Sequence, residues 1–187
     1  MRSLLPTLAA ELSTDERTLR RAVRRGAVRC RRDGPRQLAL GDGERSYLRT
    51  HWSTLSSLTK TLRTESNVRL AVLYGSVARG DDGPTSDIDL LVDLRKGTGH
   101  AALGLADRLE RRLGRSVDVA RLPLVRDASP LLLLQALDEG RVLVDRDDGW
   151  TALRTERDAI ETAAALAGED EAYAAGSALE ELLDAQT

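Results

Sequence analysis

Residues 68–92 read VRLAVLYGSVARGDDGPTSDIDLLV, and this stretch decides the fold. An apolar run typical of a β-strand, Val68–Tyr74, ends at Gly75-Ser76, and a second strand-like run begins after ten further residues at Asp87. Side chains alternate between the two faces of a strand, so Asp87 and Asp89 project together while the apolar residues between and after them point into the core. Two neighbouring carboxylates repel one another, and a hard divalent cation with oxygen ligands offsets that repulsion. The pattern therefore predicts a metal site.

A third carboxylate follows at a similar place on the next strand. The run Arg115–Ala120 alternates valines with Asp118, and the leucines of Ala101–Leu113 recur at helical spacing between the two strands. The order strand, Gly-Ser turn, strand, helix, strand predicts a compact α/β unit. Three acids on neighbouring strands suit phosphoryl transfer with two metal ions. The chain has no Gly-x-x-x-x-Gly-Lys-Ser/Thr loop, which argues against a P-loop NTPase.

The segment from Val68 to Ala120 resembles the nucleotidyltransferases of polymerase β type, and among them the minimal nucleotidyltransferases (MNT), in Gly75-Ser76, Asp87-x-Asp89 and Asp118. The resemblance implies a small mixed-sheet core with flanking helices, of the α/β (α+β) class. It also implies transfer of a nucleoside monophosphate, AMP first among them, from an NTP such as ATP to a hydroxyl group. Because minimal nucleotidyltransferases often act as antitoxins beside HEPN-domain toxins, the implied acceptor is such a toxin.

The nucleotide-binding candidates lie around the Gly-Ser pair. Gly75 has no Cβ and lets the backbone approach a phosphate closely, and the hydroxyl and amide of Ser76 can donate to the β- or γ-phosphate. Arg79, three residues further on, is either another triphosphate contact or an ordinary exposed arginine.

The metal and catalytic candidates are the three aspartates. Asp87 and Asp89 would hold Mg²⁺ ions that bridge the triphosphate oxygens. As the resemblance implies, Asp118 would hold the second ion and help to deprotonate the acceptor hydroxyl. Asp82, in the following turn, is interpreted as solvated. His51 is interpreted as a surface or helix-face residue, since the histidines have no metal-ligand spacing.

Charge is distributed unevenly along the chain, although the formal net charge is only -2. Residues 1–66 carry 14 Lys and Arg against 7 Asp and Glu, whereas residues 67–187 carry 14 against 23. Such an asymmetry indicates two functional parts, of which the basic part contacts a polyanion. The competing interpretation is that arginine is simply abundant, because the chain holds only two lysines.

The basic part has the pattern of a helix-turn-helix followed by a hairpin. Apolar residues of 4–12 predict one helix, Ser13 with Glu16 forms a capping box for a second, and Gly26 ends it. Two strands separated by Asp33-Gly34-Pro35 then predict a hairpin, or wing. This part resembles winged helix-turn-helix domains, which implies double-stranded DNA as partner. The DNA-binding candidates are Arg17, Thr18, Arg20, Arg21, Arg24 and Arg25. The alternatives are a solvated helix that docks a protein, or RNA.

The predicted organisation has four parts. Residues 1–43 form the winged helix-turn-helix-like part, 44–66 a connecting helix, 67–149 the nucleotidyltransferase core and 150–187 two C-terminal helices. The core includes a helix over Pro130–Leu137 and a strand over Arg141–Asp145. The C-terminal helices either pack on the core, form a homo-oligomer surface or clasp a partner. A single cysteine argues against a disulfide framework, and the longest apolar runs are too short for a membrane span, so a cytoplasmic location is expected.

Three functions remain open from the sequence. The first is an Mg²⁺-dependent nucleotidyltransferase that modifies a toxin and represses its own operon through the basic part. The second is a DNA-binding transcriptional regulator whose nucleotidyltransferase domain senses a nucleotide or docks a partner. The third is a nucleotidyltransferase that acts on tRNA or on a small hydroxylated molecule.

Overall fold

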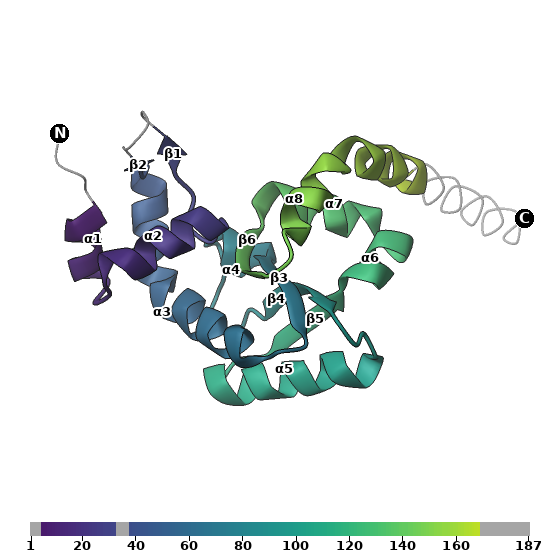
Figure 1. Cartoon of the computed structure of the whole chain (residues 1–187), viewed down its shortest axis with the longest axis horizontal. Helices are drawn as coiled ribbons and strands as arrows, with labels where there is room; N and C mark the ends of the chain where they lie inside the picture. The colour runs from purple at the N-terminus through teal and green to yellow at the C-terminus, as the bar shows by residue number, and fades with distance from the viewer. Residues whose placement is uncertain (1–4, 33–37, 169–187) are drawn as a thin grey trace, which may run out of the picture.

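The computed structural model describes residues 5–32 and 38–168 (Figure 1). Its elements follow in the order α1 (Leu5–Glu11), α2 (Glu16–Arg25), β1 (Arg31–Arg32), β2 (Leu38–Ala39), α3 (Asp42–Thr64), β3 (Val68–Tyr74), α4 (Gly75–Arg79), β4 (Ile88–Leu94), α5 (Gly99–Leu113), β5 (Val117–Arg121), α6 (Leu122–Ala128), α7 (Pro130–Glu139), β6 (Arg141–Asp145) and α8 (Gly149–Thr155). Residues 157–168 are also helical. The predicted turn at Asp33-Gly34-Pro35 and the predicted last helix, over 169–184, lie outside the described residues.

The central sheet has the strand order β5-β4-β3-β6. Strand β3 pairs antiparallel with β4 and with β6, whereas β4 pairs parallel with β5. The parallel pair is possible because α5 returns the chain to the start of the sheet between the two strands. The prediction of a mixed sheet is therefore confirmed.

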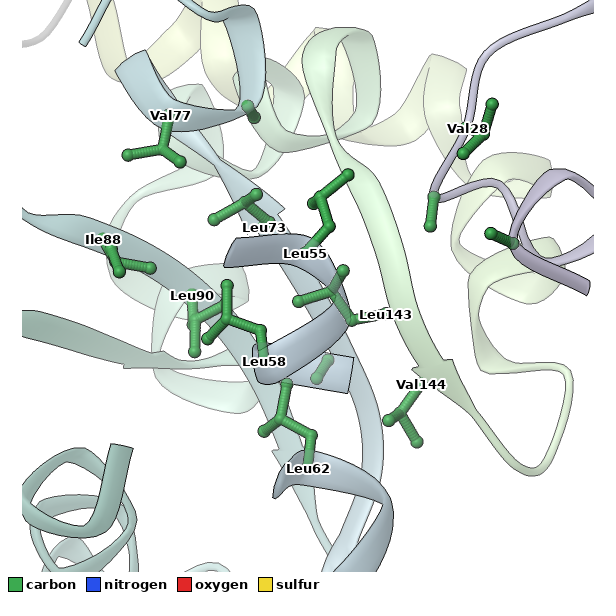
Figure 2. Packing of buried hydrophobic residues seen from close by; sticks show 14 of the residues in the cluster. Val28, Leu55, Leu58, Leu62, Leu73, Val77, Ile88, Leu90, Leu143 and Val144 are labelled. Atoms are coloured by element: carbon green, nitrogen blue, oxygen red, sulfur yellow. The ribbon is translucent and has the colours of Figure 1, made fainter. Parts of the chain in front are cut away.

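Helices cover both faces of this sheet. On one face, α3 and α5 pack on Leu73, Leu90 and their neighbours, and Figure 2 shows Leu58 and Leu62 of α3 against these strands. On the other face, α6, α7 and α8 pack on a second cluster that includes Leu91. Since both faces are buried, the strands read as nearly continuous apolar runs and not as alternating ones.

The N-terminal helices pack together ahead of the two-stranded hairpin β1–β2, in the predicted order. The capping-box prediction is wrong in its N-cap: Ser13 has a φ of 51° in the turn after α1, and Asp15 caps α2 by accepting a hydrogen bond from the Thr18 amide at 2.8 Å. Gly26 ends α2 in the left-handed conformation, as predicted. Whether this part works as a winged helix-turn-helix stays a prediction.

Helix α3 joins this N-terminal part to the sheet without a break in the core. Its first turns bury Leu48 together with residues of α1 and α2, and its last turns bury Leu58 and Leu62 against the sheet, all within one apolar cluster. The N-terminal part also contacts strand β6 directly, because the Val142 amide donates to the Gly26 carbonyl at 3.3 Å.

A buried arginine ties the same segments together. Arg141 in β6 is 1% exposed, and its guanidinium donates to the Glu44 carboxylate at 2.7 and 3.0 Å. It also donates to the carbonyls of Ala78 at 2.7 Å and Ala27 at 3.2 Å, and it lies 3.4 Å from the centre of the Tyr47 ring. The Arg141 side chain thus connects strand β6 with helices α3 and α4 and with the residues that directly follow α2.

Within the described residues, no helix combines the length and the apolar character needed to cross a membrane.

Candidate active site

The three predicted carboxylates meet at one end of the sheet. Asp89 of β4 lies beside Asp118 of β5 in the strand register, and beside Tyr74 of β3 on its other flank. Asp87 precedes β4 by one residue and has the same side-chain parity as Asp89. Asp89 is half-buried, whereas Asp87 and Asp118 are exposed. The site therefore runs from a partly enclosed strand to the open edge at β5.

The electrostatics of this end of the sheet are strongly negative. Burial raises the pKa of Asp89, and the nearby charges of Asp118 and Asp87 raise it further. Burial and then the charges of Asp89 and Asp118 raise the pKa of Tyr74 to about 12. The folded protein holds these carboxylates close together against their mutual repulsion, which is the situation that a bound cation relieves.

Gly75 forms the wall of the site next to Asp89. Its φ of 71° lies in the left-handed region, and a Cβ at this position would overlap the Asp89 Oδ2 atom. Only glycine fits there without strain. The predicted approach of the Gly75 backbone to a phosphate stays a prediction, and the structure shows Gly75 packed against the Asp89 carboxylate.

A fourth carboxylate, from Glu139 at the end of α7, lies at this wall and was not predicted. It accepts a hydrogen bond from the Gly75 amide at 3.1 Å and from Arg79 at 2.8 and 3.0 Å. Gln135 donates to it as well, at 2.7 Å. Arg79 also pairs with Asp81, and the two acidic partners, Glu139 before Asp81, raise its pKa. The sequence signal was the Glu139-Gly140 pair that ends a helix before a short strand.

Ser76, the other half of the Gly-Ser pair, is half-buried in the first turn of α4. Its carbonyl accepts the amides of Gly80 at 2.8 Å and Asp81 at 3.2 Å, which closes the five-residue helix. The pair is therefore held by a short helix and not by a simple turn.

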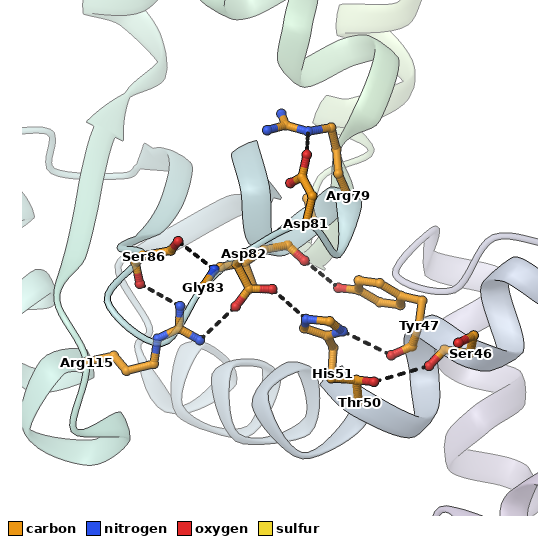
Figure 3. Close-up of polar contacts among 12 residues, drawn as sticks. Ser46, Tyr47, Thr50, His51, Arg79, Asp81, Asp82, Gly83, Ser86 and Arg115 are labelled. Carbon is orange, nitrogen blue, oxygen red and sulfur yellow. Dashed lines mark hydrogen bonds and ion pairs between the residues drawn. The ribbon is translucent and has the colours of Figure 1, made fainter.

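The loop between α4 and β4 is fixed by a buried polar network (Figure 3). His51 of α3 contacts the Asp82 carboxylate at 2.6 Å, and Arg115 donates to the same carboxylate at 3.1 Å. Burial alone would raise the pKa of Asp82, but these two hydrogen bonds outweigh it and lower the pKa. The expectation of a solvated Asp82 is wrong, because helix α3 covers this loop and the two side chains bond each other. Of the two alternatives for His51, the helix face is right and the surface is wrong, since His51 is buried on α3.

The residues predicted to bind DNA lie along α2. Arg17, Arg20, Arg21 and Arg24 are exposed, and Arg20 pairs with Glu16 at 2.7 Å. The Thr18 hydroxyl donates to Asp15 at 2.7 Å within the N-cap. Arg25 is half-buried, and its Nε donates to the Val142 carbonyl of β6 at 3.4 Å.

The site fits a divalent cation in its donor chemistry. In the part of the chain that the structure describes, no three His, Cys, Asp or Glu side chains already form a metal-binding group. Asp87, Asp89 and Asp118 nevertheless place negative charge close together on carboxylate oxygens, which are the ligands that Mg²⁺ prefers.

The same segment matches a family model described as "Polymerase beta, Nucleotidyltransferase" over residues 56–149, about half of the chain. The chain belongs to the polymerase beta nucleotidyltransferase family. The matched region contains β3, β4, β5 and β6 and with them the Gly-Ser pair, the three aspartates and Glu139. The protein is therefore an enzyme of the nucleotidyltransferase class.

Solved structures of minimal nucleotidyltransferases share the fold of this nucleotidyltransferase. A toxin–antitoxin complex with AMP-PNP contains a chain that is 25% identical, with a TM-score of 0.53, covering 66% of this chain and 97% of its own. A substituted MntA–HepT complex contains a chain that is 26% identical, with a TM-score of 0.51, covering 65% of this chain and 95% of its own. A complex of the tri-AMPylated HEPN toxin of Shewanella oneidensis with the MNT antitoxin contains a chain that is 23% identical, with a TM-score of 0.50, covering 68% of this chain and 98% of its own. At this identity, the likeness shows the fold alone. No curated protein sequence matches the chain.

Replacing Asp89 by asparagine is expected to raise the unfolding temperature of the metal-free nucleotidyltransferase at neutral pH. The folded state raises the pKa of Asp89, so holding this group ionised costs folding free energy above that pKa. The free energy of unfolding of the wild type should correspondingly increase as the pH falls through the raised pKa of Asp89, and the variant should lack this increase. Thermal unfolding across the acidic range measures both.

The matched control is Asp93→Asn on the same strand, where the carboxylate is paired with Arg69 at 3.5 Å. This change removes a favourable partner and should not raise the unfolding temperature. Adding Mg²⁺ should stabilise the wild type and not the Asp89 variant, since a ligand that binds only the folded state shifts the equilibrium toward it. An Asp89→Asn protein that melts at or below the wild-type temperature would contradict the electrostatic account.

Proposed function

We propose that this enzyme transfers AMP from ATP to a hydroxyl group on a protein partner. The observation that carries the proposal is the arrangement of Asp89 between Tyr74 and Asp118 in one register, with Gly75 packed on its carboxylate. Phosphates approach from the Gly75 side, where backbone and Arg79 donors lie. The acceptor approaches from the side of Asp118, which is exposed on the edge strand β5.

The residues have separate tasks in this reaction. Three groups bind the triphosphate oxygens: the amide of Gly75, the hydroxyl of Ser76 and the guanidinium of Arg79. The Gly75 amide and Arg79 donate to the Glu139 carboxylate in the structure, so the triphosphate takes the place of that carboxylate when it binds. Asp118 accepts the proton of the acceptor hydroxyl, whose oxygen forms a bond to the α-phosphorus while the bond to the bridging oxygen breaks and pyrophosphate leaves. Asp87, Asp89 and Asp118 would hold Mg²⁺, which when bound supplies positive charge to the reacting phosphates.

The partner that fits best is a HEPN-type toxin, so that the chain acts as its antitoxin. The support comes from the two complexes at 25% and 26% identity, which are toxin–antitoxin pairs, one of them bound to AMP-PNP. The proposed ATP site thus supplies the AMP with which the proposed antitoxin modifies its toxin.

A second function, DNA binding, is favoured by the exposed arginines of α2. Arg17, Arg21 and Arg24 are exposed on a helix that is followed by a hairpin, the order of a helix-turn-helix with a wing. We propose that residues 1–43 bind double-stranded DNA and let the antitoxin repress its own operon.

The test of the transfer reaction is label transfer from each α-³²P-labelled NTP in the presence of Mg²⁺. The acceptors, in separate reactions, are a HEPN-type protein from the same genome and total tRNA. Label on the protein from ATP alone is the expected result. Label on tRNA would replace the antitoxin proposal by a tRNA nucleotidyltransferase, and no label with any NTP and acceptor would favour the regulator without transfer activity.

A further inference from the structure

An arginine-rich cleft lies far from the active site, between the N-terminal part and the core. Its volume is about 1120 Å³, and α2, the end of α3, the end of β6 and α8 enclose it. Figure 1 shows α2 and α8 approaching the region of β6 from separate parts of the chain. The arginines that line it are Arg21, Arg24, Arg25, Arg63, Arg146 and Arg154.

At Arg146, the cleft is separated from the nucleotide site by the length of strand β3. Next to it, the Arg146 amide donates to the carbonyl of Arg69 at the beginning of β3, whereas Gly75 directly follows the end of that strand. Seven strand residues span about 20 Å. A ligand of the cleft is therefore not the NTP of the reaction.

The positive charge of the cleft exceeds the negative charge that lines it, with six arginines against two aspartates. Among the described residues, none of the six guanidinium groups pairs with a carboxylate, although most other arginines of the core do. Asp145 and Asp148 also line the cleft. The Asp145 carboxylate accepts the amides of Gly149 and Trp150 at 2.9 and 3.2 Å, so it serves the start of α8.

Two of these arginines are held in place by hydrogen bonds to backbone carbonyls. Arg25 donates to the Val142 carbonyl at 3.4 Å, and Arg146 donates to the carbonyls of Ser66 at 3.1 Å and Arg63 at 2.9 Å. Burial lowers the pKa of Arg25, and the like charge of Arg63 lowers it further. Folding thus fixes repelling cations side by side, which an anionic ligand with several charges would relieve.

We propose that this cleft binds the phosphate backbone of duplex DNA, so that the nucleotidyltransferase core shares the DNA interface with α2. The proposal rests on DNA binding by residues 1–43, because Arg21 and Arg24 belong to both surfaces. Within the described lining, Trp150 is the only aromatic side chain. Single-stranded nucleic acids are held by several stacked aromatic rings, whereas a duplex is held through its phosphates.

The test compares the salt dependence of binding to a mixed-sequence DNA duplex of about 30 base pairs, using the full-length protein. The cleft variant is Arg63→Gln/Arg154→Gln, in which both side chains are exposed and neither makes a hydrogen bond within the described residues. Its control is Arg111→Gln/Arg112→Gln on α5, which removes the same charge from an exposed site outside the cleft. A third variant, Arg17→Gln/Arg20→Gln, tests α2 alone.

The cleft variant is expected to make the negative slope of log K against log salt shallower by about two and to weaken binding at least about 10-fold near 0.1 M salt. The α5 control should keep the wild-type slope, and all variants should keep the wild-type unfolding temperature. Loss of binding only in the Arg17/Arg20 variant would overturn the cleft proposal and leave DNA binding by α2 standing. No wild-type binding at low salt would overturn both, and tighter binding to a single-stranded RNA of equal length would overturn the assignment to duplex DNA.

Discussion

Asp89→Asn is expected to reduce nucleotidyl transfer by at least about 10³-fold while leaving the fold intact. The substitution keeps the size of the side chain and removes its charge at the centre of the carboxylate cluster, between Tyr74 and Asp118. An amide cannot hold a divalent cation as strongly as a carboxylate does, and the developing charge on the pyrophosphate then stays uncompensated. Single-turnover transfer with saturating ATP measures the loss.

The control for this prediction lies on the same strand. Asp93→Asn changes an aspartate that faces Arg69 at the far end of β4 from the active site, and it should keep the wild-type transfer rate. If Asp89→Asn transferred AMP at the wild-type rate, the carboxylate cluster would not be the active site. A variant that is inactive and yet more heat-stable than the wild type would show that Asp89 is kept for chemistry at a cost in stability.

Arg141→Met is expected to lower the free energy of unfolding by about 3–5 kcal/mol. Arg141 is almost completely buried, and its removal leaves the Glu44 carboxylate without its counter-charge in a side chain that is 9% exposed. The carbonyls of Ala27 and Ala78 lose their guanidinium donors in the same step. Urea unfolding of the full chain measures the change.

Two further variants separate the buried pair from a general effect of losing an arginine. The double variant Arg141→Met/Glu44→Met should lose less than the sum of its two single variants, because it leaves no unpaired buried charge. Arg108→Met removes an equally bidentate pair, with Glu65 at 2.8 and 2.9 Å, but at the surface, where the expected loss is below about 1 kcal/mol. Equal losses at Arg141 and Arg108 would contradict the argument from burial.

The elements that could be predicted are those with a strong local pattern. Strands β3 and β6 have the predicted bounds, Val68–Tyr74 and Arg141–Asp145, because each is an apolar run between turn-forming residues. Helix α5 begins two residues earlier than predicted, since Thr98 caps it by accepting from the Ala101 amide at 3.2 Å. Helices α4 and α6 were missed, and the five residues of α4 are too few to show a helical period.

The site was predictable only where its residues follow one another along strands. Asp87, Asp89 and Asp118 could be placed together because side-chain alternation fixes their faces. Glu139 accepts a hydrogen bond from the Gly75 amide, which lies 64 residues away in the sequence, and no local pattern links the two. The same holds for His51 and Asp82, which meet because α3 packs over the loop. Contacts of this kind depend on the packing of whole elements, which a single sequence does not specify.

The hydrogen bond from Val142 to the Gly26 carbonyl has a consequence for how the chain can be divided. Strand β6 is the outermost strand on its side of the sheet, and its unpaired backbone groups would otherwise offer a template for another strand. The exit of α2 and the side chain of Arg25 occupy part of that edge. A fragment that starts after residue 43 would uncover it, and copies of the fragment would then be expected to pair edge to edge and aggregate. The N-terminal segment thus covers the edge of β6 and prevents another strand from pairing with it, independently of any DNA that it binds.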